Sequence, residues 1–110
     1  MQELEQTFLE EFDGAEEQLQ RERFKNAVIL FSKALFALCD LLLHSKLGKL
    51  PKNHQERFRL LEQHFPEVYQ AVDTIFSQYT DAYSKPVLRE TAEEVRHEIK
   101  TIIRNNAFAE

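Results

Sequence analysis

Glycine, proline and cysteine are scarce in this 110-residue chain, which has two glycines, three prolines and one cysteine. Glycine and proline are the residues that punctuate turns, and strong helix formers such as Ala, Leu, Glu and Lys dominate the remainder. This balance predicts an all-α protein. The length fits one domain that buries a core without disulfide or metal staples, so we expect a single unit over residues 1–110.

The only cysteine, Cys39, lies in the apolar run ALCDLLL. A lone cysteine excludes an intrachain disulfide and a structural zinc site built from several thiolates, and it favours a reducing, cytoplasmic compartment. No run reaches the roughly 18 uncharged apolar residues of a membrane helix. The start, MQELEQTFLEEF, is acidic, unlike the basic start of a signal peptide. We therefore expect no membrane segment.

Apolar residues recur at intervals of three and four along five segments, as on the buried face of a helix. We expect helices over residues 2–21, 23–47, 54–65, 66–83 and 86–105. Short links between them predict an antiparallel, up-and-down bundle. The segment 23–47 is the most apolar, so we expect it to form the central helix or to contribute to a dimer interface.

The limits of these helices follow from a few residues. Gly48 stands where a left-handed residue ends a helix, and Asn53 with Glu56 three residues later resembles a capping box. Asp13-Gly14 interrupts the first apolar stripe, where a lone glycine costs about 1 kcal/mol relative to alanine. We favour a continuous first helix, with a kink at this point as the alternative.

Charge is distributed unevenly. Residues 1–23 hold eight acidic residues, whereas residues 44–59 hold five Lys and Arg against one Glu. This predicts a negative end and a positive patch suited to RNA, to a nucleotide phosphate or to an acidic partner. The alternative is a solvated loop between helices. The residues that we expect to bind a ligand or partner are Lys46, Lys49, Lys52, His54 and Arg57.

Two further pairs have a spacing of one helical turn. Asp40 and His44 lie on the most apolar segment, where a carboxylate can orient an imidazole for proton transfer. The alternative places both on an exposed polar stripe with Asn26 and Lys33. Tyr79 and Tyr83 are expected to be core or interface residues, with base stacking as the other possibility.

The helix order, the stretch LPKNHQERFRLLEQHFPE and the later SQYTDAYSK resemble the HEPN family of small prokaryotic helical domains. The resemblance extends from about Leu4 to Ile103. It implies a bundle that forms a homodimer along its long helices. Many members of this family pair with a minimal nucleotidyltransferase in toxin-antitoxin operons, so such a protein is a possible partner of this chain.

Active HEPN members are metal-independent ribonucleases with an Arg-x4-6-His motif, whose Arg and His meet across the dimer cleft. Arg59 and His64 have this spacing and are the catalytic candidates that the resemblance implies. They lie in the expected third helix, whereas the family motif usually lies near the start of the fourth. The corresponding region, SQYTDAYSKPV, has neither Arg nor His.

Glycine-rich phosphate loops, paired CxxC motifs, HExxH and GxSxG are all absent from the sequence. We therefore expect no cofactor and no metal. The favoured hypothesis is a dimeric HEPN-like protein that binds RNA, a nucleotide or a nucleotidyltransferase, within a toxin-antitoxin pair. The alternatives are a metal-independent endoribonuclease that uses Arg59 and His64, and a structural helical adaptor.

Overall fold

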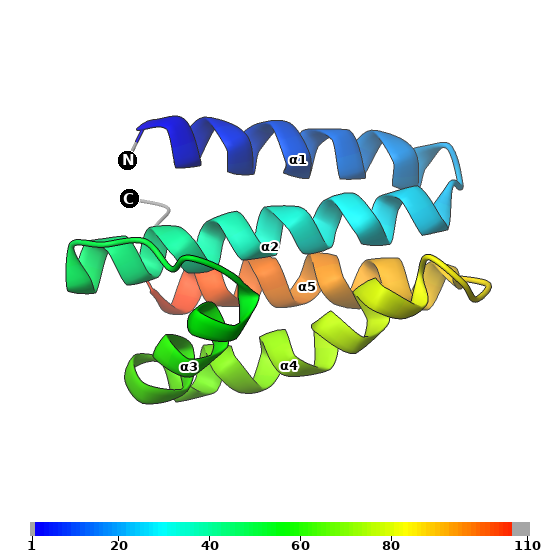
Figure 1. The fold of residues 1–110 in the computed structure, drawn as a ribbon. Helices are drawn as coiled ribbons and strands as arrows, with labels where there is room; N and C mark the ends of the chain where they lie inside the picture. Colours follow the sequence, from blue (N-terminus) through cyan, green and yellow to red (C-terminus); the bar gives the residue numbers. More distant parts are fainter. Residues whose placement is uncertain (1, 107–110) are drawn as a thin grey trace.

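The computed structural model describes residues 2–106, and within this range the chain forms helices and no strands. The helices are α1 (Gln2–Gln20), α2 (Phe24–Leu47), α3 (His54–His64), α4 (Pro66–Asp81) and α5 (Arg89–Asn105). Figure 1 shows the long helices running alternately in opposite directions along the chain, with the short α3 at one end. The prediction of an all-α bundle is confirmed.

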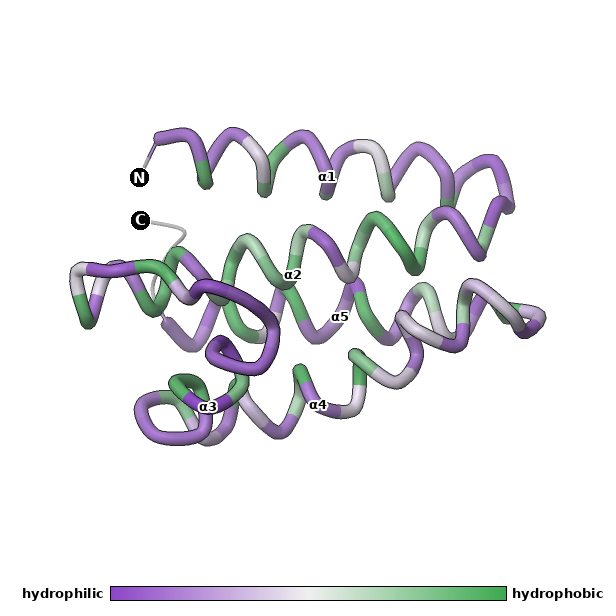
Figure 2. The backbone as a smooth tube through the Cα atoms, in the orientation of Figure 1, coloured by the Kyte–Doolittle hydropathy of each residue, from purple (hydrophilic) through white to green (hydrophobic). Residues whose placement is uncertain are grey.

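Helix α2 is the centre of the bundle, because it contacts each of the other four helices. Its side chains provide most of the core, and Phe31, Leu35, Leu38 and Leu43 are almost completely buried. Figure 2 shows the resulting pattern, in which α2 is largely hydrophobic while the segment that follows it is hydrophilic. Among the buried residues of α2, Ser32 is the polar one.

By length and composition alone, α2 would also be long and apolar enough to cross a membrane, with a mean hydropathy of 1.9 over its most apolar window. Of that window, 67% is buried inside the fold. The core helix of a globular protein has the same properties. The expected absence of a membrane segment therefore stays a prediction.

Helix α1 packs along α2 through the apolar stripe of Phe8, Phe12, Ala15 and Leu19. It is continuous across Asp13-Gly14, as favoured from the sequence. A Cβ atom on Gly14 would lie 3.4 Å from a terminal methyl carbon of Leu30 in α2. An alanine would therefore fit here with at most a small shift of the Leu30 side chain.

The helix limits differ from the sequence prediction mainly in the C-terminal half of the chain. Helix α4 ends at Asp81 rather than at residue 83, and α5 begins at Arg89 rather than at Pro86. Leu88 is extended and its carbonyl accepts the first backbone hydrogen bonds of α5. The extended segment before it brings Val87 against the core, and this packing explains why the helix starts later than Pro86 alone would indicate.

Candidate functional site

The segment between α2 and α3 takes its shape from two capping arrangements. Gly48 ends α2 in the left-handed region, with φ 73°, and its N–H donates to the His44 carbonyl. The Asn53 side chain accepts from the backbone N–H of Glu56 at 2.9 Å, and Glu56 accepts from the backbone N–H of Lys52 at 3.2 Å. The carboxylate of Glu56 thus already lies at the start of α3. An anionic ligand would therefore have to be bound by side chains and not by the backbone N–H groups of this helix end.

Asp40 and Arg57 form the best-defined polar contact of this region and join α2 to α3. Arg57 Nε donates to Asp40 Oδ1 at 2.7 Å, and Nη2 donates to Oδ2 at 3.0 Å. The two side chains are only 13% and 15% exposed. The guanidinium also lies over the Phe36 ring, 5.6 Å from its centroid. Two parallel charge-assisted hydrogen bonds fix both the position and the orientation of Arg57.

His54, in the first turn of α3, lies against the remaining edge of this guanidinium. Its Nδ1 is 2.6 Å from Arg57 Nη1. Partial burial, then the nearby Arg57 cation, lower the pKa of His54 below its ordinary value, while Asp40 opposes the shift. His54 is therefore neutral at pH 7, and it contributes a hydrogen-bonding ring rather than a positive charge.

Aromatic rings surround the inner side of His54. Its ring centroid lies 4.9 Å from that of Phe36, 5.1 Å from that of Phe76 and 6.3 Å from that of Phe58. These phenylalanines come from α2, α4 and α3 respectively. His54 thus covers an apolar cluster shared by three helices, while the residue itself remains exposed to solvent.

Tyr79 and Tyr83 extend this aromatic cluster along α4 and past its end. Tyr79 packs edge-on against Phe36, and its hydroxyl shares a 3.2 Å hydrogen bond with that of Tyr83. This hydrogen bond and partial burial raise the pKa of Tyr79 to about 12. Tyr83 is 54% exposed. Tyr79 is thus partly buried beside the core, as the core alternative predicts, whereas Tyr83 has an exposed ring.

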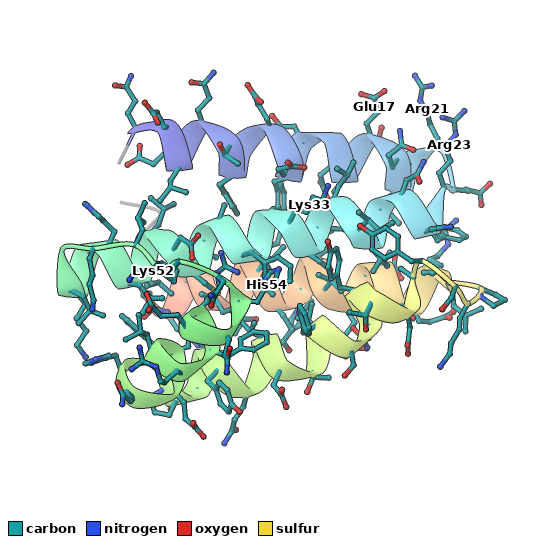
Figure 3. The ribbon with its side chains drawn as sticks, in the orientation of Figure 1. Glu17, Arg21, Arg23, Lys33, Lys52 and His54 are labelled. Carbon is teal, nitrogen blue, oxygen red and sulfur yellow. The ribbon has the colours of Figure 1, made fainter. Side chains whose placement is uncertain are left out.

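The three lysines of the predicted patch have different surroundings. Lys46 donates to the His64 carbonyl at 3.3 Å and lies over the Phe65 ring, so its ammonium group has partners within the fold. Lys49 and Lys52 are exposed, and within the described part of the chain no carboxylate forms an ion pair with them. Figure 3 shows Lys52 on the segment that leads into α3 and His54 further along, where α3 begins.

Arg57 is not a free surface cation, as the sequence prediction had assumed. It was expected to contact a ligand, but Asp40 neutralises its charge inside the fold. Asp40 in turn was considered as a partner of His44, yet both of its oxygens accept hydrogen bonds from Arg57. A guanidinium offers two aligned donors to a carboxylate, which an imidazole one turn away on the same helix lacks. His44 is partly exposed near the end of α2.

Arg59 and His64 are not brought together within one chain. Five residues along α3 place their side chains about 140° apart around the helix axis. Arg59 is exposed and forms an ion pair with Glu56 at 3.7 Å. His64 is partly buried at the last residue of the helix. An active site with both residues would therefore require a second chain.

Cys39 precedes Asp40 but does not belong to the exposed site. It is fully buried, and burial raises the pKa of its thiol far above its ordinary value. Among residues 2–106, no three His, Cys, Asp or Glu side chains are grouped in a way that could hold a metal ion.

The arrangement defines a small surface with three properties, which we call the His54 surface. It consists of the exposed lysines Lys49 and Lys52 and the ring of His54. The exposed Tyr83 ring lies further along the aromatic cluster, joined to His54 through Tyr79 and Phe36. This surface can attract an anion, donate a hydrogen bond and offer an aromatic face.

Comparison with protein-family models, with curated protein sequences and with solved structures gives no match to this chain.

Sequence reasoning placed Phe58 and Phe76 on the apolar faces of their helices, but it did not predict that they meet Phe36 around His54, and it overlooked the Asp40–Arg57 pair. A signal for them exists in the spacing, because Phe36 and Asp40 are four residues apart, and His54, Arg57 and Phe58 span three to four residues. Each set therefore lies on one face of its own helix. Only the packing of α3 against α2 shows that these two faces meet.

Proposed function

We propose that this chain is an HEPN-like, dimeric binding protein whose His54 surface contacts RNA or a nucleotide. The observation that carries the proposal is the segment that leads into α3, where the exposed cations Lys49 and Lys52 precede His54 by five and two residues and His54 packs on the aromatic cluster. Proteins that bind single-stranded nucleic acid combine cations along the backbone path with aromatic groups that stack on bases. A purely acidic protein partner would have no use for the aromatic part.

Other positive groups of the chain support this location less well. Arg21 and Arg23 lie in the turn between α1 and α2, at the end of the molecule opposite Lys52 (Figure 3). Arg21 forms an ion pair with Glu17 at 3.3 Å. Arg89 pairs with Glu22 at 2.7 Å and lies over the Phe24 ring. Arg23 is exposed at that end, without the neighbouring His and aromatic cluster.

A titration with short single-stranded RNA at low salt tests the proposal. We expect the double variant Lys49→Glu/Lys52→Glu to bind about tenfold more weakly or worse, and the log–log salt slope to fall by about 1.4, or 0.7 for each lost phosphate contact. The matched control is Lys25→Glu/Lys100→Glu, which reverses two exposed lysines on α2 and α5. Equal losses in both variants would show only a general effect of net charge.

The same titration separates the other functions. Absence of RNA binding at about 50 mM salt, together with capture of a purified nucleotidyltransferase partner through Lys49 and Lys52, would favour the toxin-antitoxin contact between proteins. Cleavage of the RNA, lost in His64→Ala, would favour the metal-independent endoribonuclease with Arg59 and His64. We expect the RNA to be bound and to remain intact.

The dimer is a separate part of the proposal. Leu9 on α1 is 56% exposed, and Ile29 and Leu30 on α2 line a hollow of about 330 Å³ beside Gln18 and Arg23. A second copy would remove these apolar groups from water. Sedimentation at several protein concentrations is expected to give a dimer, and a monomer at every concentration would exclude both this part and the adaptor alternative.

A further inference from the structure

The geometry of Arg57 determines which nitrogen of the His54 ring holds the proton. Arginine has donors and no acceptor, so the 2.6 Å contact between Arg57 Nη1 and His54 Nδ1 requires a lone pair on Nδ1. A neutral imidazole has one proton, which must then lie on Nε2. A proton on Nδ1 would place two N–H groups against each other at this distance.

Arg57 is held in place well enough to impose this choice. Asp40 binds two of its nitrogens, the Phe36 ring lies beside its plane, and the side chains of the ion pair are 13% and 15% exposed. A rotation of the guanidinium away from His54 would break both hydrogen bonds to Asp40. The ion pair therefore fixes the donor that points at His54.

The other ring nitrogen is left available for a ligand. Phe36, Phe58 and Phe76 hold the imidazole ring from the inside. Within residues 2–106, the only hydrogen-bond contact of the His54 side chain is the one through Nδ1. The residue is exposed. Nδ1 is thus used by the fold, whereas Nε2 has no hydrogen-bond partner among these residues.

From this we propose that Asp40 and Arg57 are positioning residues, which hold His54 as a directed Nε2–H donor for a phosphate oxygen of the ligand. This inference rests on the proposed function for the identity of the ligand. Lys49 and Lys52 supply attraction at a distance, whereas the His54 N–H supplies direction. Arg57, although positively charged, acts through His54 and does not touch the ligand.

The charged and titratable groups around His54 support this division of roles. Arg57 on α3 disfavours a second proton on the ring, and Asp40 on α2 partly offsets this effect. On α4 the neighbouring ring is that of Phe76, which has no charge. Partial burial, and after it the Arg57 cation, lower the pKa of His54, which favours the neutral ring with its single N–H.

Nitrogen-15 NMR of the imidazole rings tests the positioning directly and without a ligand. In the native chain we expect His54 to show the Nε2–H tautomer alone at pH 7.5. In Arg57→Met we expect a mixture of tautomers and a higher pKa for His54, because the cation and the donor are both removed. The exposed His97 on α5 is the internal reference, and its signals should not move. A tautomer mixture or an Nδ1–H form in the native chain would overturn the proposal.

Three further variants complete the test, one for folding and two for the contact with the ligand. If Arg57→Met fails to fold, Asp40→Asn/Arg57→Met removes the pair without leaving an unpaired carboxylate, and the same tautomer mixture is expected. In RNA titrations, His54→Ala should lose about tenfold in affinity, the value of one hydrogen bond to a charged group. His54→Gln, whose amide N–H reaches a similar position, should recover most of this loss.

The outcomes distinguish this inference from the proposed function. A single Nε2–H tautomer that depends on Arg57, with no RNA binding by the native chain, would leave the positioning intact and refute the RNA-binding function. RNA binding that depends on Lys49 and Lys52 but is unchanged in His54→Ala would uphold the function and refute the donor role of His54.

Discussion

The two sides of α2 are stabilised in different ways. On one side α1 lies along α2 through an apolar stripe, with Ala15 as its only fully buried residue. Its main ion pair outside its own helix joins Glu16 to Arg96 of α5, and these side chains are 31% and 34% exposed. On the other side, α3 meets α2 through Asp40 and Arg57, which are much less exposed, and through packed aromatic rings.

This difference shows that burial, more than the type of ion pair, determines how much an arginine–carboxylate pair contributes to stability. Both pairs have two hydrogen bonds, since Arg96 also reaches Glu16 through Nε and through Nη2. Water screens the Glu16–Arg96 pair, so it adds little to stability. The Asp40–Arg57 pair is screened less, so removing one partner leaves a charge with little solvent around it. Only this second pair has a neighbour, His54, whose state it can control.

The largest effect is expected on the α1 side, from Phe31→Ala. Phe31 is fully buried in α2, and its ring meets that of Phe12 edge-on at 5.4 Å. The cavity and the lost apolar contact should lower the free energy of unfolding by about 4 kcal/mol. Urea denaturation measures it. The control, Leu9→Ala, should change stability by less than about 0.5 kcal/mol at protein concentrations low enough for the monomer. At higher concentrations the loss should grow if the proposed dimer covers Leu9, and no growth would exclude α1 from the dimer interface.

The next largest effect is expected on the α3 side, from Arg57→Met. Asp40 would keep its charge without a partner, at an expected cost of about 3 kcal/mol in urea denaturation at pH 7.5. Asp40→Asn/Arg57→Met should recover at least half of this loss, because it removes the unpaired carboxylate as well. If the double variant is no more stable than the single one, the loss in Arg57→Met comes from the missing hydrogen bonds and not from the unpaired charge of Asp40.

Glu16→Gln is expected to have a much smaller effect. With both side chains about one-third exposed, the pair should contribute about 0.5 kcal/mol, and this contribution should decline further in high salt. Thermal unfolding at low and high salt measures it. A loss as large as that for Arg57→Met would remove the contrast between the two ion pairs.

The sequence was sufficient for the helices, because the spacing of apolar residues reports the buried face of each one. It placed α2 at the centre and identified Gly48 and Asn53 as capping residues, in agreement with the structure. It did not indicate the late start of α5 at Arg89, because the packing of Val87 against the core is a tertiary contact. It also did not mark the turn at Glu22, a non-glycine residue with φ 59°.

The sequence indicated which segment of the chain holds the candidate site, but not how the side chains of that segment contact the other helices. Charge counting located Lys49, Lys52 and His54 correctly on an exposed segment, since charged residues in a loop are solvated. It treated Arg57 as a further surface cation, because a sequence does not reveal that Asp40, 17 residues earlier, faces it across two helices. The loss of one positive charge from the surface follows from that contact, whereas the lowered pKa of His54 follows from its partial burial and then from the Arg57 cation.

The smallest effect is expected in the pH dependence of stability, and it reports on His54 directly. Its pKa in the folded chain lies below the ordinary value of 6.5, so the unfolded chain binds a proton first as the pH falls. Unfolding therefore takes up a proton, and His54 contributes stability that is present above about pH 6.5 and is lost as the pH drops through the lower, folded-state pKa. Urea midpoints at pH 7.5 and pH 5.5 should differ less in His54→Gln than in the native chain. Other groups titrate over this range in both proteins, so the difference between the two isolates His54. An unchanged pH dependence would mean that neither burial nor Arg57 lowers the pKa of His54, and the contrast between the two sides of α2 would then be one of stability alone.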